Sequence, residues 1–131
     1  MAGLNEKQKD ELVQRLRGMR AALLDTIRAE LLRSDAESYT ALADRVHDIG
    51  DESVAALMAD VDLAAIDREL AELRDVEEAL ARAAQGAYGK CMECGSDIGY
   101  ERLNAYPTAK RCRDDQQRHE QQYAHPNTPR M

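Results

Sequence analysis

Cys91-Met92-Glu93-Cys94-Gly95 decides the fold, together with Cys112-Arg113-Asp114-Asp115, and seventeen residues separate Cys94 from Cys112. Two Cys-x-x-Cys pairs at such a separation bring two chain segments onto one tetrahedral zinc ion. In this chain Asp115 stands where the pattern has its last cysteine. The pattern therefore predicts a small zinc-finger-like domain with an incomplete set of thiolates.

Two interpretations of the cysteine cluster stay open. In the first, Cys91, Cys94 and Cys112 bind zinc, and either Asp115 or His119 supplies the fourth ligand from the turns that follow. In the second, the fold has lost its metal and the cysteines are buried as small apolar side chains. A redox-active Cys-x-x-Cys fits less well, because no βαβ pattern surrounds it.

The segment before the cysteines is predicted to form two long helices. Asn5 can cap the first turn, and apolar residues then recur every three or four positions as far as Val46, with room for a kink near Ser34. Residues 47–51 break the pattern with a glycine and two aspartates. A second apolar stripe runs from residue 54 to about residue 84.

Two long helices joined by a short connection bury their stripes by packing against each other in antiparallel directions. The expected fold is mostly α. It has a long antiparallel two-helix coiled coil over residues 1–86 with its tip at 48–53, and a zinc-finger-like domain with a C-terminal helix over residues 87–131. That last helix is expected over about Cys112–Ala124, with ordered structure ending at Pro126.

Charge and composition restrict the partners. The net charge is -7, and residues 51–84 carry ten acids against three arginines. Such a segment is repelled by DNA and by anionic membranes, so neither sequence-specific DNA binding nor membrane binding is expected. No stretch is long and apolar enough to span a bilayer, and an odd number of cysteines suits a reducing compartment, which predicts a cytoplasmic protein. No catalytic triad, phosphate loop or HExxH motif is present, and we do not expect an enzyme.

The predicted tip carries two carboxylates, Asp48 and Asp51, three residues apart. Such a pair is common in turns and at helix starts. At the end of a rigid hairpin it is also suited to meet a cationic partner or to contribute to a Mg²⁺ site.

Taken together, these features make the chain similar to the DksA/TraR family of bacterial transcription regulators, from about Leu4 to Tyr123. The resemblance is carried by three motifs that precede Cys112: Tyr88-Gly89-Lys90-Cys91-Met92-Glu93-Cys94-Gly95, Ile98-Gly99-Tyr100-Glu101-Arg102-Leu103 and Ala105-Tyr106-Pro107-Thr108-Ala109. The family also carries D-x-x-D-x-A at its coiled-coil tip, about forty residues before the first cysteine. Asp48 and Asp51 match this motif, and Ser53 replaces the alanine.

The resemblance implies that the coiled coil enters the secondary channel of bacterial RNA polymerase. Its acidic tip then approaches the catalytic centre and modulates initiation. Basic residues of the family bind the stringent-response alarmone ppGpp jointly with polymerase, and Asp75, Tyr106 and Gln116 hold those places here. Weak or absent ppGpp synergy is therefore expected. By their charge, Arg102, Arg111 and Arg113 are candidates for contacts with the polymerase rim.

Two other functions remain alternatives. A transcript-cleavage factor resembling the Gre proteins would use the tip carboxylates to hold a catalytic Mg²⁺ and would promote hydrolysis of backtracked RNA. A coiled-coil or zinc-ribbon adaptor without a polymerase role would tolerate the change of Asp48 and Asp51 to asparagine.

Overall fold

Helices make up almost all regular structure in residues 3–124, the part of the chain that the computed structural model describes. The predicted mostly α class is therefore confirmed. The elements are α1 (Glu6–Leu32), α2 (Glu37–Asp48), α3 (Val54–Leu57), the 3₁₀ turn η1 (Ala64–Ile66), α4 (Asp67–Ala84), α5 (Tyr100–Ala105) and α6 (Arg113–Ala124). The expected end of order at Pro126 lies outside the described residues.

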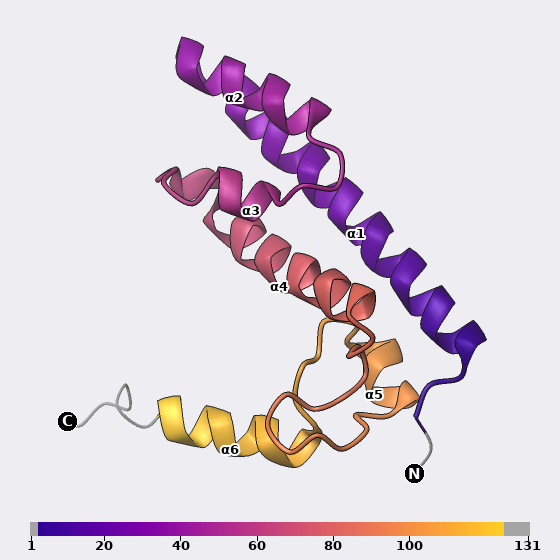
Figure 1. Cartoon of the computed structure of the whole chain (residues 1–131). Helices are drawn as coiled ribbons and strands as arrows, with labels where there is room; N and C mark the ends of the chain where they lie inside the picture. Colours follow the sequence, from indigo (N-terminus) through magenta and orange to yellow (C-terminus); the bar gives the residue numbers. More distant parts are fainter. Residues whose placement is uncertain (1–2, 125–131) are drawn as a thin grey trace, which may run out of the picture.

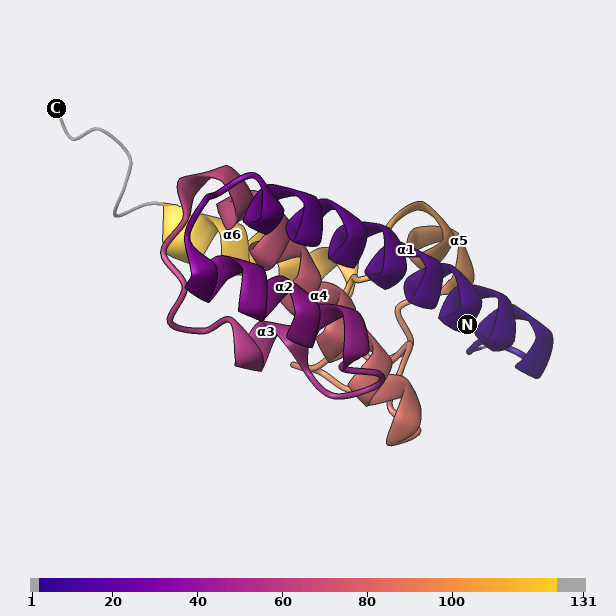
Figure 2. The ribbon, with the colours of Figure 1, turned by 90° about the horizontal axis from the view of Figure 1, so that it is seen from above.

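Helix α1 is the long axis of the molecule, and other elements pack along it (Figure 1). As predicted, Asn5 caps it: the Asn5 side chain accepts from the Gln8 amide at 2.8 Å, and the Gln8 side-chain oxygen accepts from the Asn5 amide at 3.1 Å. Its buried face is the predicted stripe, formed by Leu12, Leu16, Leu23, Ile27 and Leu31. Figure 2 shows α2 alongside the distal half of this helix.

The coiled coil is confirmed, but it is assembled from more segments than the two unbroken helices that we expected. Where the sequence allowed a kink, residues 33–36 reverse the chain, so that α2 returns along α1. The Arg28 guanidinium accordingly donates to the Ala43 carbonyl at 3.3 Å. Ser34 stabilises the turn, because its hydroxyl accepts from the Ala36 amide at 3.2 Å. Periodicity did not reveal the reversal, because a continuing helix and a returning helix bury the same stripe.

This reversal corrects the position of the predicted tip at residues 48–53. The distal corner of the α1–α2 hairpin is formed by residues 33–36, and the acidic segment follows α2 back to the middle of α1. Arg20 of α1 donates to the carbonyls of Gly50 and Glu52 at 3.0 and 2.8 Å, which fixes that location.

The second predicted helix, over residues 54–84, is also interrupted. Helix α3 ends at Leu57, and an irregular segment precedes η1 and α4. Met58 and Ile66 are buried at the two ends of this interruption, whereas Asp60 and Asp62 between them are exposed. A helix through these residues would need apolar side chains every three or four positions. Acids and aliphatic residues alternate here with a period of two, which does not form one apolar face on a helix.

The end of α4 and the start of the cysteine region follow the prediction. Helix α4 ends at Ala84, and Gly86 adopts φ +79°, a left-handed conformation that suits the residue after a helix. Beyond it, the buried hydroxyl of Tyr88 donates to the Pro107 carbonyl at 2.8 Å, and Leu103 of α5 is fully buried. The C-terminal helix is present as α6. The proposed division between residues 86 and 87 stays a prediction.

The helices that the structure describes are too polar or too short to span a membrane. Within residues 3–124, none of them combines the length and the apolar character needed to cross a bilayer.

Candidate metal centre and acidic loop

The structure brings together the three cysteines and Asp115. The ligand atoms of Cys91, Cys94, Cys112 and Asp115 all lie within 4.8 Å of one another. The Asp115 Oδ2 atom lies 3.1 Å from the Cys91 sulfur and 3.3 Å from the Cys112 sulfur. The sulfurs of Cys94 and Cys112 are 3.9 Å apart. His119, the alternative fourth ligand, is not part of this group of four.

The turn around the first two cysteines has the geometry of a metal-binding knuckle. The Glu93 amide points at the Cys91 sulfur at 3.4 Å, and the Gly95 amide donates to the Cys91 carbonyl at 3.0 Å. Gly95 adopts φ +77°, which a residue with a side chain rarely adopts. The Met92 amide reaches the Lys110 carbonyl at 2.8 Å and joins the knuckle to the segment that carries Cys112.

These residues fit a zinc ion. Zinc–sulfur bonds of about 2.3 Å place two sulfurs of a tetrahedral site roughly 3.8 Å apart, and a carboxylate oxygen roughly 3.5 Å from each sulfur. The distances of 3.9, 3.1 and 3.3 Å in this cluster are close to those values. Cys91 and Asp115 are buried, while Cys94 is exposed, so the cluster is open to solvent on one side.

Hydrogen bonds and burial shift the pKa values of the cluster residues in different directions. Burial opposes ionisation of Cys91, but backbone amides of Cys94, Cys112 and Glu93 outweigh it and lower its pKa. The backbone amide of Asp115 favours the thiolate of Cys112, but burial and the side-chain contacts with Asp115, Cys94 and Cys91 together outweigh it and raise the pKa of Cys112 to about 11. The pKa of Asp115 is depressed by hydrogen bonds from Cys91, Cys94, Arg118 and Cys112. A zinc ion would displace the remaining thiol protons.

Two of the three arginines singled out from the sequence are engaged within this domain. Arg102 donates to the Arg111 carbonyl at 3.1 Å, and Arg111 pairs with Glu93 at 2.7 Å with a side chain that is 12% exposed. Arg113 is exposed at the start of α6. Of the three, Arg113 is therefore the one that the structure presents outward.

The acidic loop, residues 48–53, is held by one ion pair that links α1 to α4. Arg20 and Glu77 approach to 3.1 Å, and their side chains are only 15% and 14% exposed. The Arg20 guanidinium also binds the carbonyls of Gly50 and Glu52, as described above. The Glu77 carboxylate accepts from the amides of Val54 and Ala55 at 2.9 and 3.2 Å, at the start of α3. We call this arrangement the Arg20–Glu77 clamp.

Ser53, which departs from the family motif, has a defined role in the loop. Its hydroxyl donates to Glu77 at 2.8 Å and accepts from the Ala56 amide at 2.9 Å, so it caps α3 and joins the clamp. An alanine at this position would make neither bond. The replacement therefore fixes the loop more firmly.

The clamp leaves the two motif carboxylates directed to solvent. Asp48 has a side chain that is 82% exposed and lies 3.3 Å from its neighbour His47, and Asp51 is exposed. Asp51 borders a recess of about 720 Å³ between α1 and α4 that Lys9 and Arg17 also line. The sequence pointed to Asp48 and Asp51 but gave no role to Glu77 or Arg20, because no motif marks either residue.

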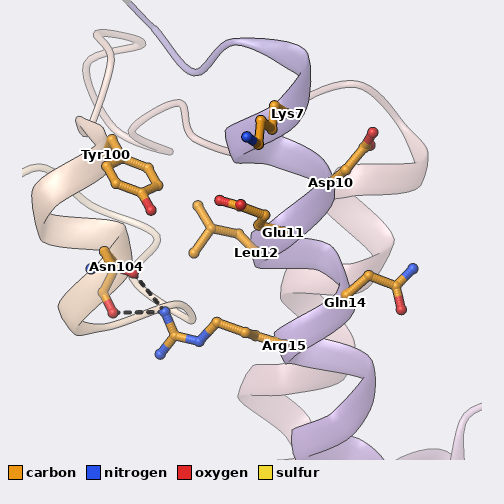
Figure 3. Close-up of a pocket in the computed structure, with 8 residues that line it drawn as sticks. All are labelled: Lys7, Asp10, Glu11, Leu12, Gln14, Arg15, Tyr100 and Asn104. Atoms are coloured by element: carbon orange, nitrogen blue, oxygen red, sulfur yellow. Dashed lines mark hydrogen bonds between the residues drawn. The ribbon is translucent and has the colours of Figure 1, made fainter.

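A second recess, of about 770 Å³, marks the junction between the helices and the cysteine domain. Figure 3 shows it between the first turns of α1 and α5, with Tyr100 and Asn104 facing Leu12 and Arg15. One Arg15 nitrogen donates to both the carbonyl and the side-chain oxygen of Asn104, each at 2.9 Å. This contact fixes α1 on α5.

Comparisons with known proteins agree on one family. A family model described as the prokaryotic dksA/traR C4-type zinc finger matches residues 86–121. The RNA polymerase-binding transcription factor DksA of Caulobacter vibrioides is 31% identical over 119 residues, which cover 89% of this chain and 79% of the relative. The protein of the same name from Escherichia coli is 40% identical over 48 residues, or 37% of this chain and 32% of the relative.

Among solved structures, transcription factor DksA2 from Pseudomonas aeruginosa is similar, with a TM-score of 0.58 and 27% identity. The alignment covers 91% of this chain and 88% of that one. The likeness therefore extends over the helices as well as the cysteine region.

The clamp predicts a difference between two adjacent glutamates of α4. Glu77→Ala removes the one carboxylate that Arg20 pairs with and leaves two amides of α3 without their acceptor, so it should lower the free energy of unfolding by on the order of 3 kcal/mol. Glu78→Ala, the matched control, removes a largely exposed pair with Lys110 and should cost about 0–1 kcal/mol. Urea unfolding measures both, and amide exchange should accelerate at residues 50–57 in the first variant alone. Equal losses would contradict the role of the clamp.

Proposed function

Because the chain belongs to the DksA/TraR family, we propose that it regulates transcription by binding bacterial RNA polymerase. The observation that carries this proposal is the extent of the match with a DksA named for polymerase binding, which covers 89% of this chain. The match includes the helices and the acidic loop as well as the cysteine domain. The ten acids of residues 51–84 repel a negatively charged partner such as duplex DNA. The proposed target is therefore the polymerase itself, and the proposed location is the cytoplasm.

Within this function, the acidic loop is the proposed effector. Asp48 and Asp51 present exposed carboxylates, and Ser53 joins the clamp that fixes their backbone. In the proposed mechanism the loop reaches the catalytic centre through the secondary channel. There the carboxylates change the electrostatic field around cations and basic groups and thereby modulate initiation.

The effector role gives a direct test. In transcription from a ribosomal-type promoter, the wild-type chain should change the output, and Asp51→Asn should bind polymerase but lose most of that change, because only the charge is removed. Asp60→Asn, at an exposed acid outside the motif, is the matched control and should behave as wild type. Output and binding are measured in the same reactions. If the wild-type chain does not bind polymerase, the adaptor function replaces this proposal.

The location of the loop adds a requirement to the mechanism. The loop lies beside the middle of α1, so its delivery into a narrow channel requires α2 to leave α1 and the turn at 33–36 to straighten. Residues 33–36 contain neither glycine nor proline, and Arg33 already has helical φ and ψ of −73° and −18°. A continuous helix is therefore accessible there, and it would carry the loop to the end of the hairpin.

This rearrangement is measurable as a distance. Spin labels introduced as unnatural amino acids at the exposed positions 17 and 47 should lie close together in the free protein, since Arg20 contacts Gly50. On polymerase the separation should grow to roughly 45 Å, the length of thirty helical residues. A label pair at positions 17 and 29, both exposed on α1 and roughly 18 Å apart along it, is the control and should not change. An unchanged first distance with full activity would refute the straightening.

Weak ppGpp synergy is a further part of the proposal. A polyphosphate binds to several cationic side chains. The positions that match the family's ppGpp-binding basic residues hold Asp75, Tyr106 and Gln116 instead. Tyr106 is half-exposed, and Gln116 is hydrogen-bonded to Glu120. We expect the transcription response to be the same with and without ppGpp. Introducing the missing charges with Asp75→Lys and Gln116→Lys should create a ppGpp-dependent increase. Strong potentiation of the wild-type chain would contradict this expectation.

We further propose that the cysteine cluster binds one zinc ion through Cys91, Cys94, Cys112 and Asp115. The fit of the four ligand atoms to a tetrahedral site supports it. Bound zinc would supply a cross-link between the knuckle and the start of α6. The role is structural, because a fourth protein ligand leaves no open position for substrate.

A further inference from the structure

Asp115 uses its two carboxylate oxygens for different partners. Oδ2 faces the sulfurs of Cys91 and Cys112 at 3.1 and 3.3 Å, whereas Oδ1 is paired with the guanidinium of Arg118. The Asp115 side chain is 7% exposed and that of Arg118 is 70% exposed, so a buried carboxylate is paired with a largely exposed guanidinium. Both residues lie on α6, one turn apart.

We propose that Arg118 is a positioning residue for the oxygen ligand of the zinc site. By holding Oδ1, it directs Oδ2 at the metal and keeps the carboxylate bound through one oxygen. The inference rests on the zinc site proposed above and goes beyond it, because neither the cysteine pattern nor the family motif contains Arg118.

The replacement of a thiolate by a carboxylate creates the need for such a residue. A carboxylate has two equivalent oxygens and turns about its bond to Cβ, so it can bind a metal through either oxygen or both. Partners behind the ligands fix such orientations in metal sites. Asp115 and Arg118 are one turn apart on α6, so the helix itself places the guanidinium beside the carboxylate.

Charge supports the same assignment. Three thiolates and one carboxylate around Zn²⁺ leave two net negative charges in a partly buried cluster, and Arg118 offsets one of them. Two other cations of the domain are engaged elsewhere: Lys110 pairs with Glu78, and Arg111 pairs with Glu93. Among the described residues of α6, Asp115 alone is buried, so the ligand and its partner also determine where this helix lies.

Zinc affinity tests the inference. The dissociation constant for Zn²⁺, measured by competition with a chromogenic chelator, should rise about 10- to 100-fold in Arg118→Ala. Arg118→Lys should restore part of the loss, because it keeps the charge but not the planar fork. Arg113→Ala, which removes an exposed arginine of the same helix, is the matched control and should leave the affinity unchanged.

A double-mutant cycle separates positioning from a general effect on folding. Asp115→Cys replaces the carboxylate by a thiolate that needs no such partner, so adding Arg118→Ala to it should change the zinc affinity less than twofold. An equal loss in both backgrounds would overturn the inference, as would a wild-type affinity in Arg118→Ala alone. If the wild-type chain itself binds no Zn²⁺, the proposed site fails first, which distinguishes the two failures.

Discussion

The ion pair between Arg20 and Glu77 is the interaction on which the arrangement of the helices depends. A loop between two helices leaves carbonyls at the end of one helix and amides at the start of the next without partners. The pair supplies both kinds of partner: the guanidinium binds the carbonyls of Gly50 and Glu52, and the carboxylate binds the amides of Val54 and Ala55. Because Arg20 belongs to α1 and Glu77 to α4, the same bonds join two helices and the loop.

The cysteine cluster and the clamp use an acid and an arginine in comparable ways. In each, one carboxylate contacts its arginine and also a group that must be held in place. Glu77 holds the backbone of α3, and Asp115 faces the cysteine sulfurs. Both carboxylates are largely shielded from solvent, where such bonds are stronger than at an exposed surface. The acidic composition of the chain therefore includes individual acids with structural roles beside its solvated face.

The sequence predicted those features that rest on local chemistry. The cap at Asn5, the end of α4 near Gly86 and the polar C-terminal helix follow from residue types at fixed offsets, and the structure has all three. The cysteine spacing also predicted that Asp115 lies in the cluster, as it does in the structure. The path of the helices was not predictable in the same way, because the stripe through Leu31 and Tyr39 is satisfied by a straight helix or by a reversal at Ser34. Arg20 and Glu77 are recognised only by contacts that no spacing rule describes.

The bond between Arg15 and Asn104 has a consequence for how the molecule is made. Its partners are 89 residues apart, close to the two ends of the described chain. During translation α1 emerges first, and it can collect α2 and then α4 while synthesis continues. Its docking on α5 must wait until the cysteine region has left the ribosome. The junction between the helical arm and its base therefore assembles later than the contacts among α1, α2 and α4.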